Sequence, residues 1–469
     1  MTTTAVNRRT FIKDLAAATA GLSISPAVAH GTEKRKERRR TNLLLVLADQ
    51  WRFSAFGHGS DPLVRTPHFD RLAEQGARWT RAYAANPLCT PNRSAITTGR
   101  FPHQTSMITN SLMLPPAERC ISHVFGEAGY ATHYIGKWHM DGQAKPGFVP
   151  PGWRRRGFGT FEGFNRGHFY YKTPTFTSEG ERMNVKGYEP TLQTDLAIQF
   201  MKRNKDRPFF CYLSWGPPHM PYKPPKRFDR FKRDGLEWRP NVPAGQRKHK
   251  KTTRELAGYY GLCESLDHEL GRLLRALDEL RLADNTLVVF TSDHGDMHGS
   301  HGKRYKGHPE EESLHIPLLM RCPARIKAGQ TPPTLVSSID LMPTLLSVCG
   351  LETPSTCTGR DLSAAVLGER APAVQSIYAE GRMHGDGAWR AIVTPRNKLA
   401  VNTAGKVTHL FDLAKDPYEM KNLADEKAQA KLRTDLLAKL HRWAKDTGDP
   451  FPEVPTRAKV MYAGPTASY

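Results

Sequence analysis

Short apolar runs, each bounded by polar residues, recur along the first two thirds of the chain. They span residues 43–48, 130–136, 208–214, 286–291 and 316–321. Runs of this length, nearly continuous rather than alternating, are typical of strands buried on both faces of a mostly parallel sheet. Helical patterns lie between them, the clearest over residues 253–282, where apolar side chains recur at three- and four-residue spacing. Strands that alternate with helices predict an α/β fold with a large, mixed but mostly parallel sheet flanked by helices.

The pattern changes after residue 367. Four short strand-like segments follow, at residues 374–380, 388–394, 398–402 and 407–412, and then an amphipathic helix at 427–445. These elements predict a smaller C-terminal α+β subdomain over 368–469, after a larger domain over 41–367. Residues 148–188, rich in Gly, Arg and aromatic side chains, are expected to form a long insertion in the wall of a pocket.

The first residues are expected to form a targeting signal rather than a part of the folded protein. Arg8 and Arg9 precede a small, weakly hydrophobic stretch, and an A-x-A cleavage site ends at Ala29. This pattern resembles a twin-arginine export signal over residues 1–29, which implies transfer by the twin-arginine export machinery to the periplasm or the medium. An incidental basic N-terminus is the less favoured alternative. The charged run at 33–40 predicts a solvated lead into the first strand rather than a polyanion-binding arm.

Composition narrows the class of protein. The chain has 469 residues, 39% of them apolar, which can supply a core and argues against a disordered chain. No uninterrupted apolar run reaches the ~20 residues of a membrane span, which excludes an integral membrane protein. Lys and Arg number 68 against 46 Asp and Glu, and this net charge of +22 predicts anionic partners. A nucleic-acid partner has only the net charge in its favour and is not expected.

Seven cysteines are an odd number for an exported chain. Cys211, Cys263 and Cys322 lie in apolar, strand-like or helix-like contexts and are expected to be small core residues. Cys349 and Cys357 flank a short loop and are a candidate disulfide once outside the cytoplasm.

Chemically capable side chains follow four of the predicted strands. They are, in chain order, Asp49, Gln50, Lys137, His139, His219, Asp293 and His294. In open α/β sheets ligands bind beyond the carboxyl ends of the strands. Two acids with an amide and an imidazole make an oxygen-rich site for a divalent cation, and the Lys and His groups around it suit an anionic substrate. One Asp after a strand is commonly a helix cap, but four such endings together favour a functional site.

A cysteine lies at the predicted start of a helix between the first two of these strands. Pro91 suits the first turn of that helix and Gly99 its end. Cys89 is thereby placed at a helix N-terminus, where unpaired N–H groups favour an anion, and Arg93 can turn back to the same spot. The segment indicates an activated cysteine in an anion cradle, with a buried structural cysteine as the alternative.

The motif Cys-x-Pro-x-Arg, followed by Thr98-Gly99-Arg100, resembles the signature of the type I sulfatases, members of the alkaline-phosphatase-like superfamily. The resemblance extends over most of the chain after the signal. Further matching segments are Asp49, 136–139, 218–219, 291–295, Lys306 with 311–313, 410–413 and 416–417. The twelve-residue signature at 89–100 is highly specific, whereas each of the other segments alone is weak.

The resemblance implies a covalent modification and a set of roles. In that family a formylglycine-generating maturation enzyme oxidises the signature cysteine to Cα-formylglycine, so position 89 would carry an aldehyde, hydrated on the metal, whose oxygen attacks sulfur. The implied metal ligands are Asp49, Gln50, Asp293 and His294. The implied catalytic groups are Cys89, Arg93 at the hydrate, Lys137 and Lys306 on the sulfate oxygens, His139 as base for sulfate release and His219 as acid for the leaving oxygen.

Two positions depart from the family pattern. Many sulfatases have Ser where Asn92 stands, but the modification motif needs only Cys, Pro and Arg. The family often has a second Asp where this chain has Gln50, and the imidazole of His294 replaces another oxygen ligand. Calcium is the family default, and the nitrogen ligand widens the choice to manganese or magnesium.

The resemblance implies a sulfuric ester hydrolase that acts on a sulfated carbohydrate or an aryl sulfate. A formylglycine-dependent phosphonate monoester or phosphodiester hydrolase is the alternative activity, because it has a similar ligand set. A polyanion-binding, lectin-like protein without activity is disfavoured because every catalytic group is present. A thiolate at Cys89 is a further possibility, but it would place negative charge beside two carboxylates and facing an anionic ester, which favours the aldehyde.

Overall fold

The computed structural model describes residues 40–57, 61–172, 174–184, 187–370, 373–381 and 387–451. The predicted export signal and the charged run after it lie outside the described residues, apart from Arg40. The described residues from Arg40 to Phe451 belong to one compact unit, so the residues before and after position 367 are parts of the same unit. Among the described residues, no helix has the length and apolarity that crossing a membrane requires.

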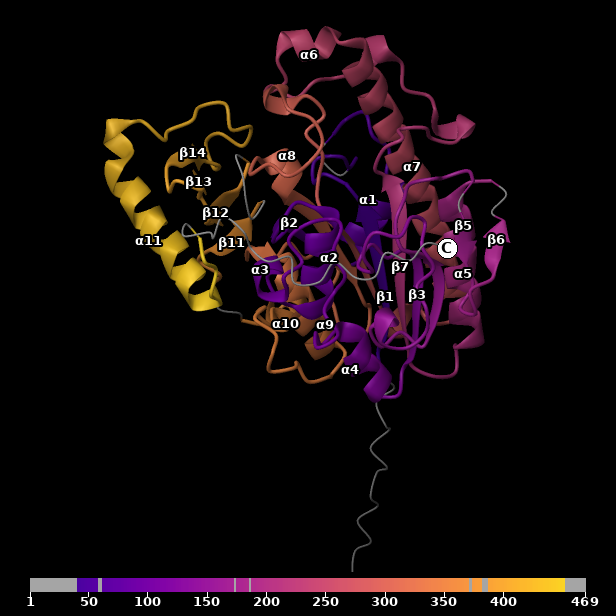
Figure 1. Cartoon of the computed structure of the whole chain (residues 1–469). Coiled ribbons are helices and arrows are strands. Elements are labelled where there is room, and N and C mark those ends of the chain that lie inside the picture. The colour runs from indigo at the N-terminus through magenta and orange to yellow at the C-terminus, as the bar shows by residue number, and fades with distance from the viewer. Residues whose placement is uncertain are drawn as a thin grey trace, which may run out of the picture. The chain divides into compact units, whose positions relative to one another are not determined.

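A ten-stranded sheet forms the centre of this unit (Figure 1), with the strand order β10-β2-β9-β8-β1-β7-β3-β4-β5-β6. The strands are β1 (Asn42–Asp49), β2 (Ala77–Tyr83), β3 (Ala131–Lys137), β4 (Thr160–Phe164), β5 (Pro174–Phe176), β6 (Arg182–Asn184), β7 (Phe209–Pro218), β8 (Thr286–Ser292), β9 (His315–Arg321) and β10 (Val336–Ser337). The central strands β8, β1, β7, β3 and β4 are parallel, and β9 joins β8 antiparallel. The predicted mixed, mostly parallel sheet is confirmed.

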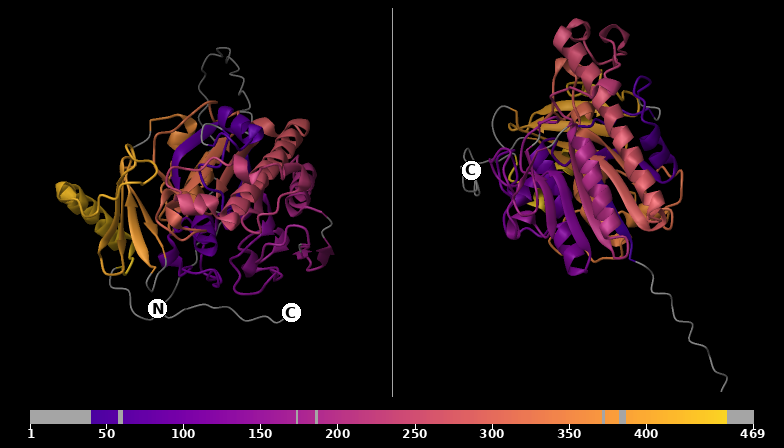
Figure 2. Two further views of the ribbon diagram at one scale, coloured as in Figure 1. Left: turned by 90° about the horizontal axis from the view of Figure 1, so that it is seen from above. Right: turned by 90° about the vertical axis from the view of Figure 1, so that its right-hand side faces the viewer.

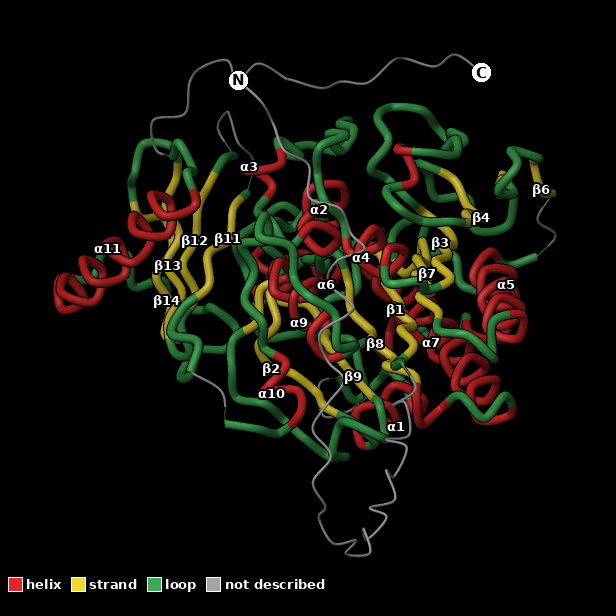
Figure 3. Tube along the Cα trace, turned by 90° about the horizontal axis from the view of Figure 1, so that it is seen from below, coloured by secondary structure: helices red, strands yellow, loops and turns green. Residues whose placement is uncertain are grey.

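Helices cover both faces of this sheet (Figures 2 and 3). One face carries α1 (Pro67–Glu74), α5 (Glu189–Arg203) and α7 (Lys250–Glu279), and the other carries α2 (Cys89–Thr98), α4 (Ile121–Glu127) and α9 (Leu341–Val348). Side chains of β1 alternate between two cores, with Leu44 and Val46 under α7 and Leu43, Leu45 and Leu47 on the opposite face. The strand is buried along its whole length, which explains its continuous apolar sequence. The shorter helices are α3 (Pro102–Thr105), α6 (Ala244–Lys248), α8 (Glu311–Leu314) and α10 (Ser363–Leu367).

A second, antiparallel sheet contains β11 (Ile377–Glu380), β12 (Trp389–Val393), β13 (Asn397–Asn402) and β14 (Val407–Asp412). One of its faces joins the main core, and the other packs under α11 (Ala430–Thr447), the yellow helix of Figure 1. Leu436 and Leu440 are the fully buried leucines of α11. The strands and the helix predicted for the C-terminal subdomain are confirmed, with the α-helix beginning at Ala430, after a short 3-10 turn.

The main sheet has five strands that the sequence did not predict, namely β2, β4, β5, β6 and β10. In β2, the half-buried Arg78 and Arg81 interrupt the apolar positions. The structure also contradicts the proposed disulfide, since Cys349 and Cys357 are both free thiols. The two sulfurs face different surroundings, because Cys349 belongs to the main core whereas the Cys357 Sγ lies 3.4 Å from the carbonyl oxygen of Gly99.

A buried histidine joins the C-terminal layer to α3. His103 Nδ1 lies 2.6 Å from a Glu380 carboxylate oxygen, and its Nε2 lies 3.1 Å from the carbonyl oxygen of Thr447. Both neighbours accept hydrogen bonds, so only the protonated ring can donate to both. Burial alone would lower the pKa of His103, but Glu380, Asp449 and the Thr447 carbonyl raise it above its ordinary value.

We predict that His103 stabilises the fold most at acidic pH. Its folded-state pKa is raised, so its contribution is fully present below pH ~6.5 and is lost as the pH rises through the raised pKa. The substitution His103→Gln should lower the free energy of unfolding by about 1–3 kcal/mol at acidic pH and by less at alkaline pH. Thermal unfolding of both proteins across pH measures this difference, and a deficit that stays constant with pH would contradict it.

Candidate active site

All ten side chains predicted for the site converge at one edge of the main sheet. The strand ends supply most of them: β1 ends in Asp49, β3 in Lys137, and β7 and β8 end directly before His219 and Asp293. Residue Asp49 pairs in register with Pro218 of the neighbouring strand, so the residues that follow come together. Cys89 opens α2, which ends at Gly99 in the left-handed conformation, as the sequence predicted.

A single buried guanidinium organises the two carboxylates. Arg93 Nε donates to Asp293 Oδ2 at 3.0 Å, and its terminal NH2 group donates to Asp49 Oδ2 at 3.1 Å. The other terminal nitrogen donates to the Lys137 carbonyl oxygen and to the Ser214 hydroxyl. Because Arg93 engages Oδ2 of each carboxylate, both Oδ1 atoms lie toward His294, at 3.8 Å for Asp49 and 3.5 Å for Asp293.

Gln50 presents its amide oxygen to the site. Its side-chain nitrogen donates to the Asp296 carboxylate and to the Tyr222 hydroxyl, which fixes the orientation of the amide. The amide oxygen Oε1 accepts from Lys306 Nζ at 2.8 Å. Gln50 has a φ of 71°, a costly conformation for a residue with a side chain. The sequence search missed Asp296 and Tyr222, because neither belongs to a recognisable motif.

The surroundings of Cys89 are cationic. Its sulfur lies 3.1 Å from Lys306 Nζ and 3.2 Å from His294 Nε2. Burial and Asp49 raise the pKa of the thiol, but Lys137, Lys306 and His294 outweigh them and lower it below its ordinary value. The effect of Asp49 agrees with the sequence argument that carboxylates disfavour a thiolate here, and the fold adds three cationic groups that act in the opposite direction.

Two histidines flank the carboxylates. The backbone N–H of His139 donates to the Asn165 carbonyl, and Thr90 donates to the carbonyl of His139, so the chain holds this residue at a φ of 57°. Burial, Lys137 and Arg93 hold the pKa of His139 well below its usual range, which favours a neutral ring able to accept a proton. His219 donates its backbone N–H to the Asp49 carbonyl, and its Nδ1 lies 2.8 Å from the Met220 carbonyl.

A fourth histidine in the site, besides His139, His219 and His294, was not predicted. His168 comes from the insertion at 148–188, which was expected to form a pocket wall. Its Nε2 lies 3.0 Å from Lys137 Nζ, and its ring stacks on the ring of His219. The available signal was the Gly167-His168 pair inside a Gly- and aromatic-rich stretch, which by itself points to no chemistry.

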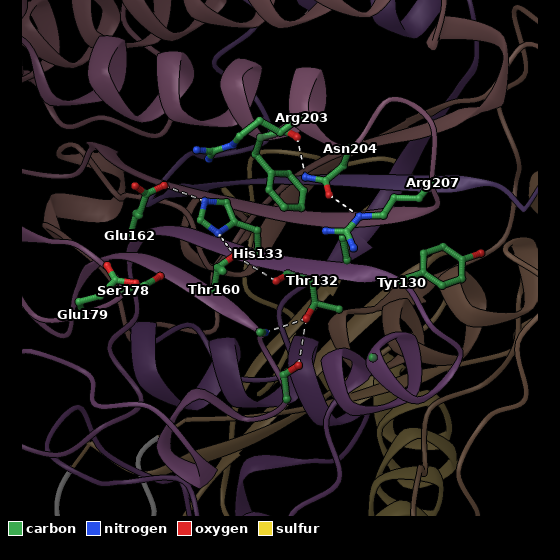
Figure 4. A pocket seen from close by; sticks show the side chains of 15 residues that line it. Tyr130, Thr132, His133, Thr160, Glu162, Ser178, Glu179, Arg203, Asn204 and Arg207 are labelled. Atoms are coloured by element: carbon green, nitrogen blue, oxygen red, sulfur yellow. Dashed lines mark hydrogen bonds and ion pairs between the residues drawn. The ribbon is translucent and has the colours of Figure 1, made fainter.

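A cavity of about 700 Å³ lies at the opposite edge of the sheet (Figure 4). Its lining includes Tyr130, His133, Thr160, Arg203 and Arg207, from the start of β3 and β4 and the end of α5. None of the ten predicted site residues lines it.

Comparison with known proteins places these features in a family. Residues 41–351 match the sulfatase family, and residues 297–446 match the C-terminal region of N-sulphoglucosamine sulphohydrolase. An ulvan-active sulfatase of Formosa agariphila is 33% identical, covering 89% of this chain and 84% of that protein. An N-acetylglucosamine-6-O-sulfatase of Bacteroides thetaiotaomicron is 25% identical, over 92% of this chain and 90% of its own length.

The solved structure of a protein from Bacteroides fragilis described as a putative sulfatase superposes with a TM-score of 0.81 and 30% identity, covering 90% of this chain and 99% of that one. The chain therefore belongs to the sulfatase family, with the alkaline-phosphatase-like fold, and it is a sulfatase enzyme.

Proposed function

We propose that this protein hydrolyses sulfate esters of a sulfated carbohydrate, with formylglycine formed from Cys89 and with a divalent cation. The observation that carries the proposal is the placement of Cys89. It opens α2 within 3.1 Å of Lys306 Nζ and 3.2 Å of His294 Nε2, beside two carboxylates that Arg93 orients. A nucleophile at this position lies beside the carboxylates that can hold a cation and beside the lysine that can bind the anionic group of a substrate.

The residues present fit a divalent cation. Ligand atoms of Asp49, Asp293, His294 and Cys89 all lie within 4.8 Å of one another. His294 Nδ1 lies 3.0 Å from the carbonyl of its neighbour Gly295. In the neutral ring that would bind a cation, the proton is therefore on Nδ1 and the Nε2 lone pair lies toward the carboxylates. The oriented amide oxygen of Gln50 completes a set of three oxygen donors and one nitrogen donor, which suits calcium, manganese or magnesium.

The chain's own groups supply the remaining chemistry. When formed, formylglycine supplies an oxygen nucleophile in its hydrated state, and the cation lowers the pKa of that oxygen. Lys137 and Lys306 bind sulfate oxygens and offset the charge that grows on the transferring group. Nδ1 of His219 faces the Met220 carbonyl, so His219 must take up a second proton on Nε2, and it is this proton that it donates to the leaving oxygen. Neutral His139 accepts the proton whose loss releases sulfate. Arg93, which already bonds four protein groups, acts by holding the carboxylates.

Charge and relatives support a carbohydrate substrate. The net charge of +22 favours a polyanion, and the relative from B. thetaiotaomicron is named for a sulfated amino sugar. Residues 1–29 support export by the twin-arginine machinery to the periplasm or the medium, where such polymers are met. The alternative, phosphonate monoester or phosphodiester hydrolysis, predicts faster turnover of an aryl phosphodiester than of the matching aryl sulfate. A direct comparison of the two substrates separates these activities.

We predict that active protein carries formylglycine at position 89. The peptide should show the corresponding mass loss and react with hydrazides, and Cys89→Ala should bind substrate while turnover falls by ~10³-fold or more. Cys89→Ser should at best be sulfated once and stall. Cys357→Ser is the control, since that thiol lies outside the site, and should keep its activity. Full activity in protein whose Cys89 is an unmodified thiol would overturn the mechanism.

We predict that Asp293→Ala loses turnover together with most of the divalent cation. Gln50→Asp should be milder and should shift the preferred cation, because it adds a carboxylate without removing a ligand. Elemental analysis and activity with added calcium, manganese or magnesium measure both effects. Asp278→Ala, on the exposed side of α7, is the control for a lost carboxylate. Retention of the metal by Asp293→Ala would show that the site is placed wrongly.

We predict that added salt lowers activity on a sulfated polymer more steeply than activity on a small aryl sulfate. Long-range attraction to the basic surface is screened beyond ~8–10 Å at physiological ionic strength, whereas contacts inside the buried site are screened less. Measurements of kcat/KM against ionic strength for both substrates test this, and parallel curves would rule out steering by charge.

A further inference from the structure

His168 packs flat against the histidine assigned as the leaving-group acid. The two ring centroids of His168 and His219 are 3.6 Å apart, and the ring planes differ by 2°. The ring of His219 otherwise has one hydrogen-bond contact, between Nδ1 and the Met220 carbonyl. One hydrogen bond restrains an edge of an imidazole but leaves its tilt free, so the stacked neighbour supplies the second restraint.

The same side chain restrains a sulfate-binding lysine. Lys137 Nζ lies 3.0 Å from His168 Nε2 and also pairs with Asp49. An ammonium group can only donate, so Nε2 of His168 accepts, and the ring is neutral with its proton on Nδ1. His168 thus contacts both the lysine and the histidine that face the substrate.

The segment that carries His168 is clamped to the end of β7. The Tyr170 hydroxyl donates to the carbonyl oxygens of Gly216 and His219. Gly167 has a φ of 135°, and a Cβ there would lie 2.2 Å from the Phe169 ring, so this turn requires glycine. The loop is therefore built to keep the His168 ring in place rather than to move it.

We propose that His168 is a positioning residue that aims the ring of His219 at the leaving oxygen and holds Lys137 toward the sulfate. The inference rests on the proposed function, because it takes His219 as the acid. Proton donation matters most when the leaving group is a poor one, such as the alkoxide of a sugar, and least for a nitrophenolate. Misplacement of the acid by a fraction of an ångström should therefore appear as a dependence on the leaving group.

The test compares kcat/KM for a sugar sulfate and for 4-nitrophenyl sulfate. His168→Ala should lower the first by ~10²-fold and the second by less than ~10-fold. His168→Phe keeps a flat ring but loses the hydrogen-bond acceptor. The ratio of kcat/KM for the sugar sulfate to kcat/KM for 4-nitrophenyl sulfate should therefore return most of the way to its wild-type value. The KM for both substrates should rise. His168→Gln keeps an acceptor without the ring and should resemble His168→Ala in that ratio. Equal losses on both substrates in His168→Ala would overturn the inference.

Two further variants separate this inference from the proposed function. His219→Ala should show the same leaving-group dependence, and adding His168→Ala to it should cause little further loss on the sugar sulfate. If His219→Ala lowers kcat/KM equally for both substrates, the assignment of His219 as the acid is wrong. If His219→Ala is selective but His168→Ala is not, only the positioning role is wrong. His133→Ala is the matched control, because this β3 histidine stacks on Phe200 outside the site, and any loss should be equal for both substrates.

Discussion

One buried guanidinium holds together the ends of the central strands. Arg93 lies 1% exposed between the carboxylates of Asp49 and Asp293, and it also bonds the Lys137 carbonyl and the Ser214 hydroxyl. These partners come from, or directly follow, the four central strands β1, β8, β3 and β7. A buried charge is tolerated only when its hydrogen-bonding capacity is met, so the fold and the site depend on the same contacts.

This arrangement decides which atoms face the ligand. Arg93 engages the Oδ2 atoms and leaves the Oδ1 atoms toward His294. Burial raises the pKa of Asp49, yet Lys137, His219, Arg93 and Lys306 hold it well below its usual range, so the carboxylate stays charged. Arg93 and Lys137 pair with the two carboxylates, whereas Lys306 bonds the Gln50 amide oxygen and the Cys89 sulfur. An anionic ester can therefore pair with Lys306 without becoming an unpaired buried charge.

Most site residues that could be predicted from the sequence lie at strand ends, whereas His168, which could not be predicted, lies in an insertion. Asp49, Lys137, His219 and Asp293 end or follow strands with continuous apolar sequences, so topology alone brings them together. His168 reaches the site from a long insertion, where no periodicity fixes the position of a side chain. The C-terminal sheet was predicted from four short strand-like segments, whereas β2 was missed because arginines occupy its half-exposed positions. The sequence likewise placed the carboxylates near Cys89 but could not give the distances of 3.1 Å to Lys306 and 3.2 Å to His294.

The burial of α2 bears on the order of events in biosynthesis. Every residue of this helix is buried, and Cys89 is 1% exposed at its first position, under the ends of β1 and β8. Another protein can reach that thiol only while the chain is still open at this point. An enzyme that converts Cys89, as the proposed function requires, would therefore have to act before the central strands close. On that proposal, folding itself sets the time limit for maturation.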